Sequence, residues 1–215
     1  TTKMVLVNAL HLAGPWQEPF ETSYALPFTR LDGSTVDVET MTDSQGTSVG
    51  YAEGDDYLAC SVALRGGDLE LAVIVPDDFA SFEDGLDQPK LASVFDAMEP
   101  ELANVYLPQF TIQTDLALKE TLKAMGMPTP FGDGQHFSGI SPLLAKISGV
   151  FHDTAIEVDL GGIRAAAATG IVLDDEVGGE GGSVECRIDR PFLLALRDQP
   201  TGAVLFFGRV LDPSA

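Results

Sequence analysis

Residues 157–182 constrain this chain more than any other stretch, because they cannot form one regular core element along their whole length. The stretch begins like a strand, with apolar Ile156 and Val158 alternating with acids. The Gly161-Gly162 pair interrupts it, and four alanines, Thr-Gly-Ile-Val, three acids and a glycine-rich tract follow. Two interpretations fit: a long surface loop, and a ribbon narrow enough to slide between two strands.

Composition indicates a single globular domain with an acidic surface. The chain has 215 residues, 45% of them apolar, which is enough for one sizeable core. Its 33 acidic and 12 basic residues give a formal net charge of −21. Nucleic acids and anionic membranes attract basic patches, so we expect neither as a partner.

Residues that carry enzymatic or metal chemistry lack the spacing that such chemistry needs. There is no Gly-x-Ser-x-Gly, His-Glu-x-x-His or Walker pattern, so no enzyme is expected. His11, His136 and His152 have no metal-ligand spacing, and we expect no metal or other cofactor. Cys60 and Cys186 do not form a C-x-x-C pair, and we expect two free, partly buried thiols.

Hydrophobic patterning predicts a chain made mostly of strands. The first strand, at 4–13, is apolar throughout, which predicts burial on both faces. Further strands are expected within 24–42 around a turn at Asp32-Gly33, as a hairpin at 57–64 and 69–75, at 103–113, and as a buried hairpin at 192–197 and 203–211. Helical patterns occur at 79–99, broken by Pro89, from Asp115 to Met125 with Thr114 or Asp115 as cap and Gly126 at the end, and at 142–149.

Several of these motifs resemble the serpins, a family of serine protease inhibitors. The run Gly162-Ile163-Arg164-Ala165-Ala166-Ala167-Ala168-Thr169-Gly170 is similar to the proximal hinge of the serpin reactive loop, and its flanks at 152–158 and 189–192 also resemble the family. The resemblance covers essentially the whole chain but only the C-terminal three-fifths of a serpin. It implies an α+β fold of mostly antiparallel and mixed sheets with few helices, built as one domain over 1–215 with a mobile loop at about 160–186.

The run from Asn8 to Trp16 resembles a serpin signature that begins with Asn-Ala and closes with Gly-x-Trp. The resemblance implies that Asn8 pairs with His152 at the shutter, where the main sheet opens. Serpins hold the top of this sheet, the breach, with a glutamate–lysine pair, and Leu160 and Gln109 stand at those two positions here. Both charges are missing together, so no unpaired charge is buried. We expect Leu160 to pack near Trp16, and Gln109 to bond to backbone.

The resemblance implies that a serine protease attacks the loop, forms an acyl-enzyme, and is carried along as the freed loop inserts into the main sheet. Residues Gly162 to Thr169 would be the hinge of this movement. Side chains alternate along a strand, so if Ala165, Ala167 and Thr169 face inward, Ile163 does too and Arg164 faces solvent.

Family spacing puts the cut fourteen residues after the hinge glycine, between Glu176 and Val177. That bond implies a target protease that prefers Glu or Asp. Cleavage after Leu173 or Val177 stays an alternative, and it points to chymotrypsin-like or elastase-like targets.

Two functions remain open. The alanine-rich hinge favours a suicide inhibitor, whereas Ile163, in place of the usual small polar residue, favours a non-inhibitory serpin that acts as a binding module, or an inactive truncated fragment. We expect self-association or a complementing N-terminal portion, because the strand at 4–13 would otherwise expose a wide apolar surface. No signal peptide or membrane span is visible, and the compartment stays open, with secretion favoured.

Overall fold

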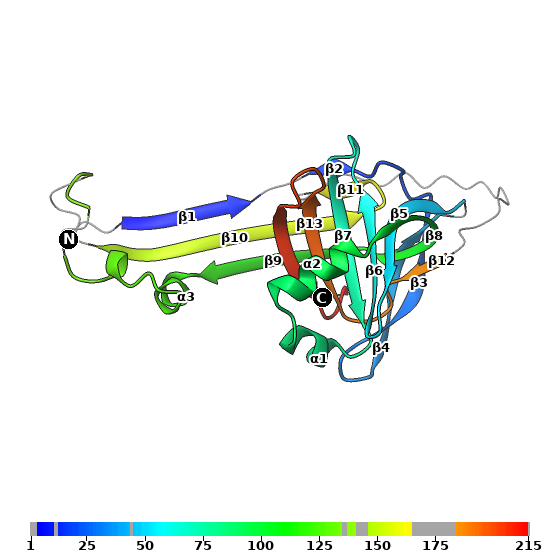
Figure 1. The fold of residues 1–215 in the computed structure, drawn as a ribbon, viewed down its shortest axis with the longest axis horizontal. Coiled ribbons are helices and arrows are strands. Elements are labelled where there is room, and N and C mark those ends of the chain that lie inside the picture. The colour runs from blue at the N-terminus through cyan, green and yellow to red at the C-terminus, as the bar shows by residue number, and fades with distance from the viewer. Residues whose placement is uncertain are drawn as a thin grey trace. The chain divides into compact units, whose positions relative to one another are not determined.

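The structure of the chain, a computed structural model, describes residues 4–10, 13–43, 45–134, 137–140, 146–164 and 184–214. These form two compact units, one from residues 1–12 and 112–156 and one from 13–111 and 157–215. Strands dominate both units, and the described ranges hold three α-helices (Figure 1). The predicted α+β class, with mixed and antiparallel sheets and few helices, is therefore confirmed.

The larger unit is built on a nine-stranded sheet with the order β14-β13-β7-β6-β5-β8-β4-β3, to which β12 is added beside β8. The predicted hairpins are present as β3 with β4, β6 with β7 and β13 with β14. The sequence patterns missed β5, whose small residues give only weak alternation. The strands are β3 Thr22–Thr29, β4 Thr35–Thr42, β5 Thr47–Glu53, β6 Tyr57–Ala63, β7 Leu69–Pro76, β8 Glu99–Pro108, β12 Val184–Arg187, β13 Phe192–Asp198 and β14 Val204–Val210.

Two short helices cover part of this sheet. α1 (Phe79–Asp84) and α2 (Gln88–Asp96) bury Phe79, Phe82 and Val94 against Ala59, Ile74 and other residues of β5, β6, β7 and β13. Pro89 does not break the helical segment as predicted. It lies in the first turn of α2, where a missing N–H costs nothing, and the break falls at 85–87.

The smaller unit contains β1 (Met4–Leu10) and most of β10 (Ile147–Asp159), which pair in parallel. β1 is not buried on both faces as predicted, since Val5 is 49% and Val7 67% exposed. Within the described residues β1 pairs with β10 alone, and its exposed side chains agree with the apolar surface expected for this strand.

The helix predicted from Asp115 begins later. Residues up to Ala117 belong to β9 (Phe110–Ala117), which pairs with β10, and α3 spans Lys119–Ala124. Neither Thr114 nor Asp115 is its cap, because pairing with β10 prevails over the helical pattern here. Gly126, with φ +95°, follows the helix end as predicted.

Three other predictions about local structure are wrong. Residues 147–149 of the expected helix at 142–149 lie in β10, and the rest of that segment includes residues outside the described ranges. β14 is not buried, since Val204, Leu205 and Phe207 are each more than 40% exposed.

The third correction concerns the cysteines. Cys60 and Cys186 are not free thiols but form a disulfide, with their Cα atoms 6.5 Å apart and both residues buried. Nothing in their spacing along the sequence, 126 residues, could reveal this, because the pairing depends on β12 lying near β6.

No described helix is long and apolar enough to cross a bilayer.

Candidate functional site at the loop hinge

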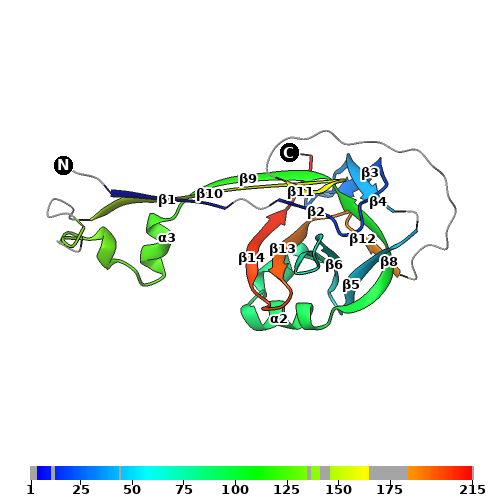
Figure 2. The same ribbon diagram turned by 90° about the horizontal axis from the view of Figure 1, so that it is seen from above.

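The first residues of the alanine-rich stretch form a short strand within a sheet. β11 (Gly162–Arg164) turns back from the end of β10 and pairs antiparallel with it, with Ile163 opposite Val158 and Gly162 opposite Asp159. On its other side β11 pairs antiparallel with β2 (Gly14–Pro15), and both ribbon views place β2 and β11 side by side (Figures 1 and 2). The start of the hinge therefore lies between β10 and β2 in the uncut chain.

Gly162 makes the closest approach in this site. Its φ is +140°, and a Cβ atom built on it would lie 2.2 Å from the carbonyl oxygen of Gly14 and 2.6 Å from the Cα atom of Pro15. No side chain fits there, because the obstructing atoms belong to backbone that cannot rotate away. Gly162 thus allows β11 to lie against β2.

Trp16 fixes the turn that leads into β11. The indole Nε1–H donates to the carbonyl oxygen of Asp159 at 2.8 Å, and the backbone N–H of Trp16 donates to that of Gly161 at 3.3 Å. Trp16 is fully buried and packs edge-on against Phe20, with 5.7 Å between ring centroids. The turn is therefore held by a rigid, completely buried side chain.

Asp159 closes the same turn from inside, and sequence reasoning missed it. Its Oδ1 accepts a hydrogen bond of 2.7 Å from the backbone N–H of Gly161, while its backbone oxygen accepts from Trp16. An Asp that bonds to the N–H two residues on is a common turn former. The Asp-Leu-Gly sequence could have indicated this turn.

Ile163 faces inward, as expected from strand alternation. It is 1% exposed, and its register partner Val158 is also 1% exposed. Arg164 is the register partner of Glu157, and its side chain lies outside the described residues. An apolar side chain at 163 is therefore compatible with a place in the sheet.

The two positions that replace the serpin ion pair lie near this hinge. Gln109 and Asp159 both line a cavity of about 390 Å³, whose wall also includes Glu39 and Ser214. The backbone N–H of Gln109 donates to the carbonyl oxygen of Glu39 at 2.7 Å, and Leu160 is half-buried. Packing of Leu160 near Trp16, and a bond from the Gln109 side chain to backbone, stay predictions.

Asn8 and His152 are neighbours in the smaller unit. The parallel ladder of β1 and β10 sets them directly opposite each other. Asn8 is exposed and His152 is half-buried, so a buried amide partner is not required here. Their hydrogen bond stays a prediction.

The remaining predicted loop residues lie outside the described ranges. These are Ala165, Ala166, Ala167, Ala168, Thr169, Glu176 and Val177. Among the residues that the structure does describe, no group of three or more His, Cys, Asp or Glu side chains could hold a metal ion.

Known proteins of one family are similar to this chain. A family model described as "Serpin (serine protease inhibitor)" matches residues 1–213. Plasminogen activator inhibitor 2 of Homo sapiens is 32% identical over 226 residues, which cover 99% of this chain and 54% of that protein. Serpin B10 of Bos taurus is 34% identical over 226 residues, covering 99% of this chain and 55% of the relative.

Solved structures show the same fold. Uncleaved ovalbumin matches with a TM-score of 0.81 and 28% identity, over 97% of this chain and 54% of the ovalbumin chain. Serpin48 of the insect Tenebrio molitor, described as a highly specific serpin, matches with a TM-score of 0.79 and 27% identity. The match covers 97% of this chain and 56% of the Serpin48 chain. The chain spans about half the length of these relatives, and it belongs to the serpin family of serine protease inhibitors.

Proposed function

We propose that this chain is the loop-bearing part of a serine endopeptidase inhibitor that acts by suicide cleavage. The target protease cuts the loop at about 160–186, and the upstream part of the loop then inserts into the sheet that contains β10. One observation carries the proposal: β11, the start of that loop, already pairs with β10 on one side and β2 on the other.

The register of β11 gives the partners that later loop residues would meet. Continuing it sets Ala165 opposite Ile156, Ala167 opposite Thr154 and Thr169 opposite His152. Their partners on β10 are the buried or half-buried ones, at 156, 154 and 152, whereas Ala155 and Asp153 are exposed. The small side chains of Ala165, Ala167 and Thr169 would therefore face the interior, as strand alternation requires.

Insertion needs a place that β1 now occupies. β1 pairs with β10 from Ile147 to Thr154, so loop residues from Ala167 onward can bond to β10 only if β1 separates from it. Residues 162–174 would then pair along all 13 residues of β10, and Glu176 would stand just beyond its end. The predicted cut at Glu176–Val177 therefore matches the length of strand that β10 can accept.

Free energy would come from exchanging a solvated segment for a paired strand. Each new intramolecular hydrogen bond contributes roughly 0.5–1.5 kcal/mol net, and burying small apolar side chains adds to it. An attached protease would move with the cut end, over roughly 40 Å for 13 residues at about 3.3 Å each.

A non-inhibitory serpin or an inactive fragment is the second candidate. The exposed apolar side chains of Val5 and Val7 on β1 favour this candidate. An exposed apolar surface of this kind promotes association with other molecules, which suits a binding module or an incomplete chain.

Incubation of the chain with proteases of each class separates the two candidates. A covalent complex that survives SDS, with the loop cut, is the result expected for an inhibitor. Clean cleavage by every class, with no complex and no gain in stability, would contradict the inhibitor proposal and leave the second candidate.

A further inference from the structure

We propose that a cavity beyond the C-terminal end of α2 binds a small uncharged molecule through a carboxamide group. The cavity has a volume of about 450 Å³ and lies wholly within the larger unit. Its described lining holds a guanidinium beside a carboxylate and includes no hinge residue from 159–164, so binding there would be independent of loop insertion.

The cavity forms where α2 stops covering the large sheet. α1 and α2 pack over Ala52 of β5 and Ala59 of β6. Gly50 and Ser61 lie two residues further along these strands, on the same face, and are register partners. α2 has ended before Met98, so this part of the face is open to a space whose size is typical of small-molecule sites.

Gly50 keeps the floor of the cavity open. A Cβ atom built on it would lie 2.6 Å from the Oγ atom of Ser61 and 3.4 Å from the Cβ atom of Met98. A larger residue at this position would therefore fill the space above Ser61. With glycine there, the Ser61 hydroxyl lines the cavity, where it can donate or accept a hydrogen bond.

A guanidinium is held in a fixed position in the same cavity. Arg197 of β13 lies opposite Glu70 of β7, with 3.0 Å between Nη1 and Oε1, and its Cζ atom is 4.0 Å from the centroid of the Phe95 ring. The Nε2–H of Gln199 donates to the other oxygen of Glu70 at 3.0 Å. The two charged side chains are only 14% and 9% exposed, so both are oriented before any ligand binds.

The protein alone does not satisfy this guanidinium. An arginine carries five N–H donors, and the Nε–H of Arg197 is buried without a hydrogen-bond partner in the described part of the chain. Burying an ion pair costs hydration that its attraction offsets only when the remaining donors are also bonded. An oxygen atom of a ligand beside Arg197 would supply an acceptor that the chain lacks.

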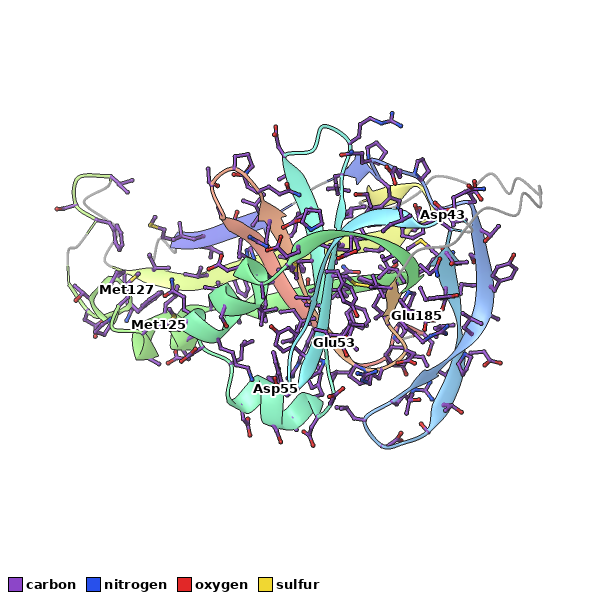
Figure 3. The ribbon with its side chains drawn as sticks, turned by 45° about the vertical axis from the view of Figure 1, so that its right-hand side comes forward. Asp43, Glu53, Asp55, Met125, Met127 and Glu185 are labelled. Atoms are coloured by element: carbon purple, nitrogen blue, oxygen red, sulfur yellow. A yellow bond between two sulfur atoms is a disulfide. The ribbon has the colours of Figure 1, made fainter. Side chains whose placement is uncertain are left out.

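The charges of the lining select an uncharged ligand with both an acceptor and a donor. Among the described residues, the charged side chains that line the cavity are Glu18, Glu70 and Arg197. Glu53 and Asp55 are at the other end of β5 and do not line it (Figure 3). An anion would meet two carboxylates, and a cation would meet the guanidinium. A carboxamide brings an oxygen for Arg197 and N–H groups for the carboxylates without a net charge.

Apolar side chains supply a surface for the rest of the ligand. Phe95, Met98 and Pro100 line the cavity on the side where α2 ends. Pro100 is the partner of Gly50 on β8, and it has no N–H group that would need an acceptor. An aromatic or aliphatic body can therefore contact these three residues while the carboxamide lies beside Arg197.

The test titrates the chain, at neutral pH, with three probes that share one apolar body and differ in charge. These are 2-naphthamide, which is neutral, 2-naphthoate, an anion, and 2-(aminomethyl)naphthalene, a cation. Calorimetry measures the affinities, and amide NMR locates the binding. We expect saturable shifts at Gly50 and Ser61, and an affinity for 2-naphthamide at least about tenfold higher than for either charged probe.

Three variants test the residues that form the site, and thermal unfolding checks that each is folded. G50A places a methyl group in the cavity and should weaken 2-naphthamide binding about tenfold or more. G85A is the matched control, because Gly85 does not line the cavity and its built Cβ comes no closer than 3.4 Å to another atom. E70Q/R197M removes both charges together, so neither is left unpaired, and it should also weaken binding about tenfold. S61A removes the hydroxyl alone and should weaken binding about threefold, which keeps the polar contacts testable if the double variant does not fold.

Equal affinity for the three probes would overturn the carboxamide assignment, because the cavity would then accept an apolar body alone. Tighter binding of either charged probe would overturn it as well. Parental affinity in G50A, or the absence of shifts at both Gly50 and Ser61, would show that the cavity is not the binding site. Parental affinity in both E70Q/R197M and S61A would contradict the assigned polar contacts.

Discussion

Gly162 lies so close to Gly14 that a Cβ atom on Gly162 would stand 2.2 Å from the carbonyl oxygen of Gly14. This contact joins the start of β11 to β2 and explains why a glycine is needed at residue 162.

G162A should displace β11 from β2. The variant combines an unfavourable positive φ with a backbone clash, and we expect it to lose more than about 3 kcal/mol of unfolding free energy or to release the hinge. Denaturant unfolding and hydrogen exchange at Ile163 measure the two outcomes. G66A is the control, because Gly66 has φ +107° with no atom within 4 Å of its built Cβ, so about 1–2 kcal/mol is expected there. Equal losses in both variants would contradict the close approach.

W16F should loosen the turn at 159–161. The variant removes the Nε1–H bond to the Asp159 carbonyl oxygen and part of a fully buried ring, at a cost of about 1–3 kcal/mol. Hydrogen exchange should rise at Gly161 and Ile163. F20L is the matched control, since it alters the ring packed against Trp16 and leaves the hydrogen bond in place. Faster exchange in F20L than in W16F would argue against a role for the indole N–H.

The fold could be predicted from the sequence further than the hinge could. The hydrophobic pattern predicted the strands of the β3–β4 and β6–β7 hairpins, because these strands either have one strongly apolar face or are apolar throughout. The predicted start of α3 was wrong, because the N–H of Leu118 donates to the carbonyl oxygen of Val150 and the preceding residues pair with β10. A residue pattern records local preference, and pairing between distant strands prevailed over it.

The disulfide and β11 show the same limit at the site. The Gly161-Gly162 break predicted an end to the strand, and the chain does turn there, but Gly162 begins a second strand because β2 offers it a partner. The bond between Cys60 and Cys186 likewise depends on strands that meet only in the folded chain. The inward face of Ile163 was predictable, because strand alternation is a local property.

The cut should fall between Glu176 and Val177. A Glu-specific serine protease is expected to release a fragment that begins at Val177, as measured by mass spectrometry, and E176A should abolish that product. E180A is the control, since Glu180 lies in the same loop after the predicted bond. A first cut after Leu173 or Val177 by chymotrypsin-like or elastase-like enzymes would reassign the bond.

The C-terminal tail next to the hinge cavity should loosen in acid. Hydrogen bonds from Ser214 and then Arg30 to the Asp212 carboxylate hold its pKa below the usual value of 3.8. A carboxyl whose pKa is lowered by folding contributes stability above its unfolded pKa, and that stability is lost as the pH falls through its folded pKa. The contribution is therefore complete at neutral pH and fades below about pH 4.

Carbon NMR of the Asp212 carboxyl group measures this directly. The titration midpoint should lie below 3.8 in the parent chain and rise in R30M and S214A. R190M is the control, because Arg190 pairs with Asp77 and Asp189 instead. A midpoint unchanged by R30M and S214A would contradict the assigned cause.

The most direct test of loop insertion measures the melting temperature before and after the loop is cut, in A167R and A168R. If the register of β11 continued through an inserted loop, residue 167 would face inward, opposite half-buried Thr154, and residue 168 outward, opposite exposed Asp153. If the loop inserts, cutting should raise the melting temperature of the parent chain and of A168R by about 10 °C or more, corresponding to roughly 3–5 kcal/mol, and should leave that of A167R unchanged. Equal responses in the two variants, or no rise in the parent chain, would contradict insertion of the loop beside β10.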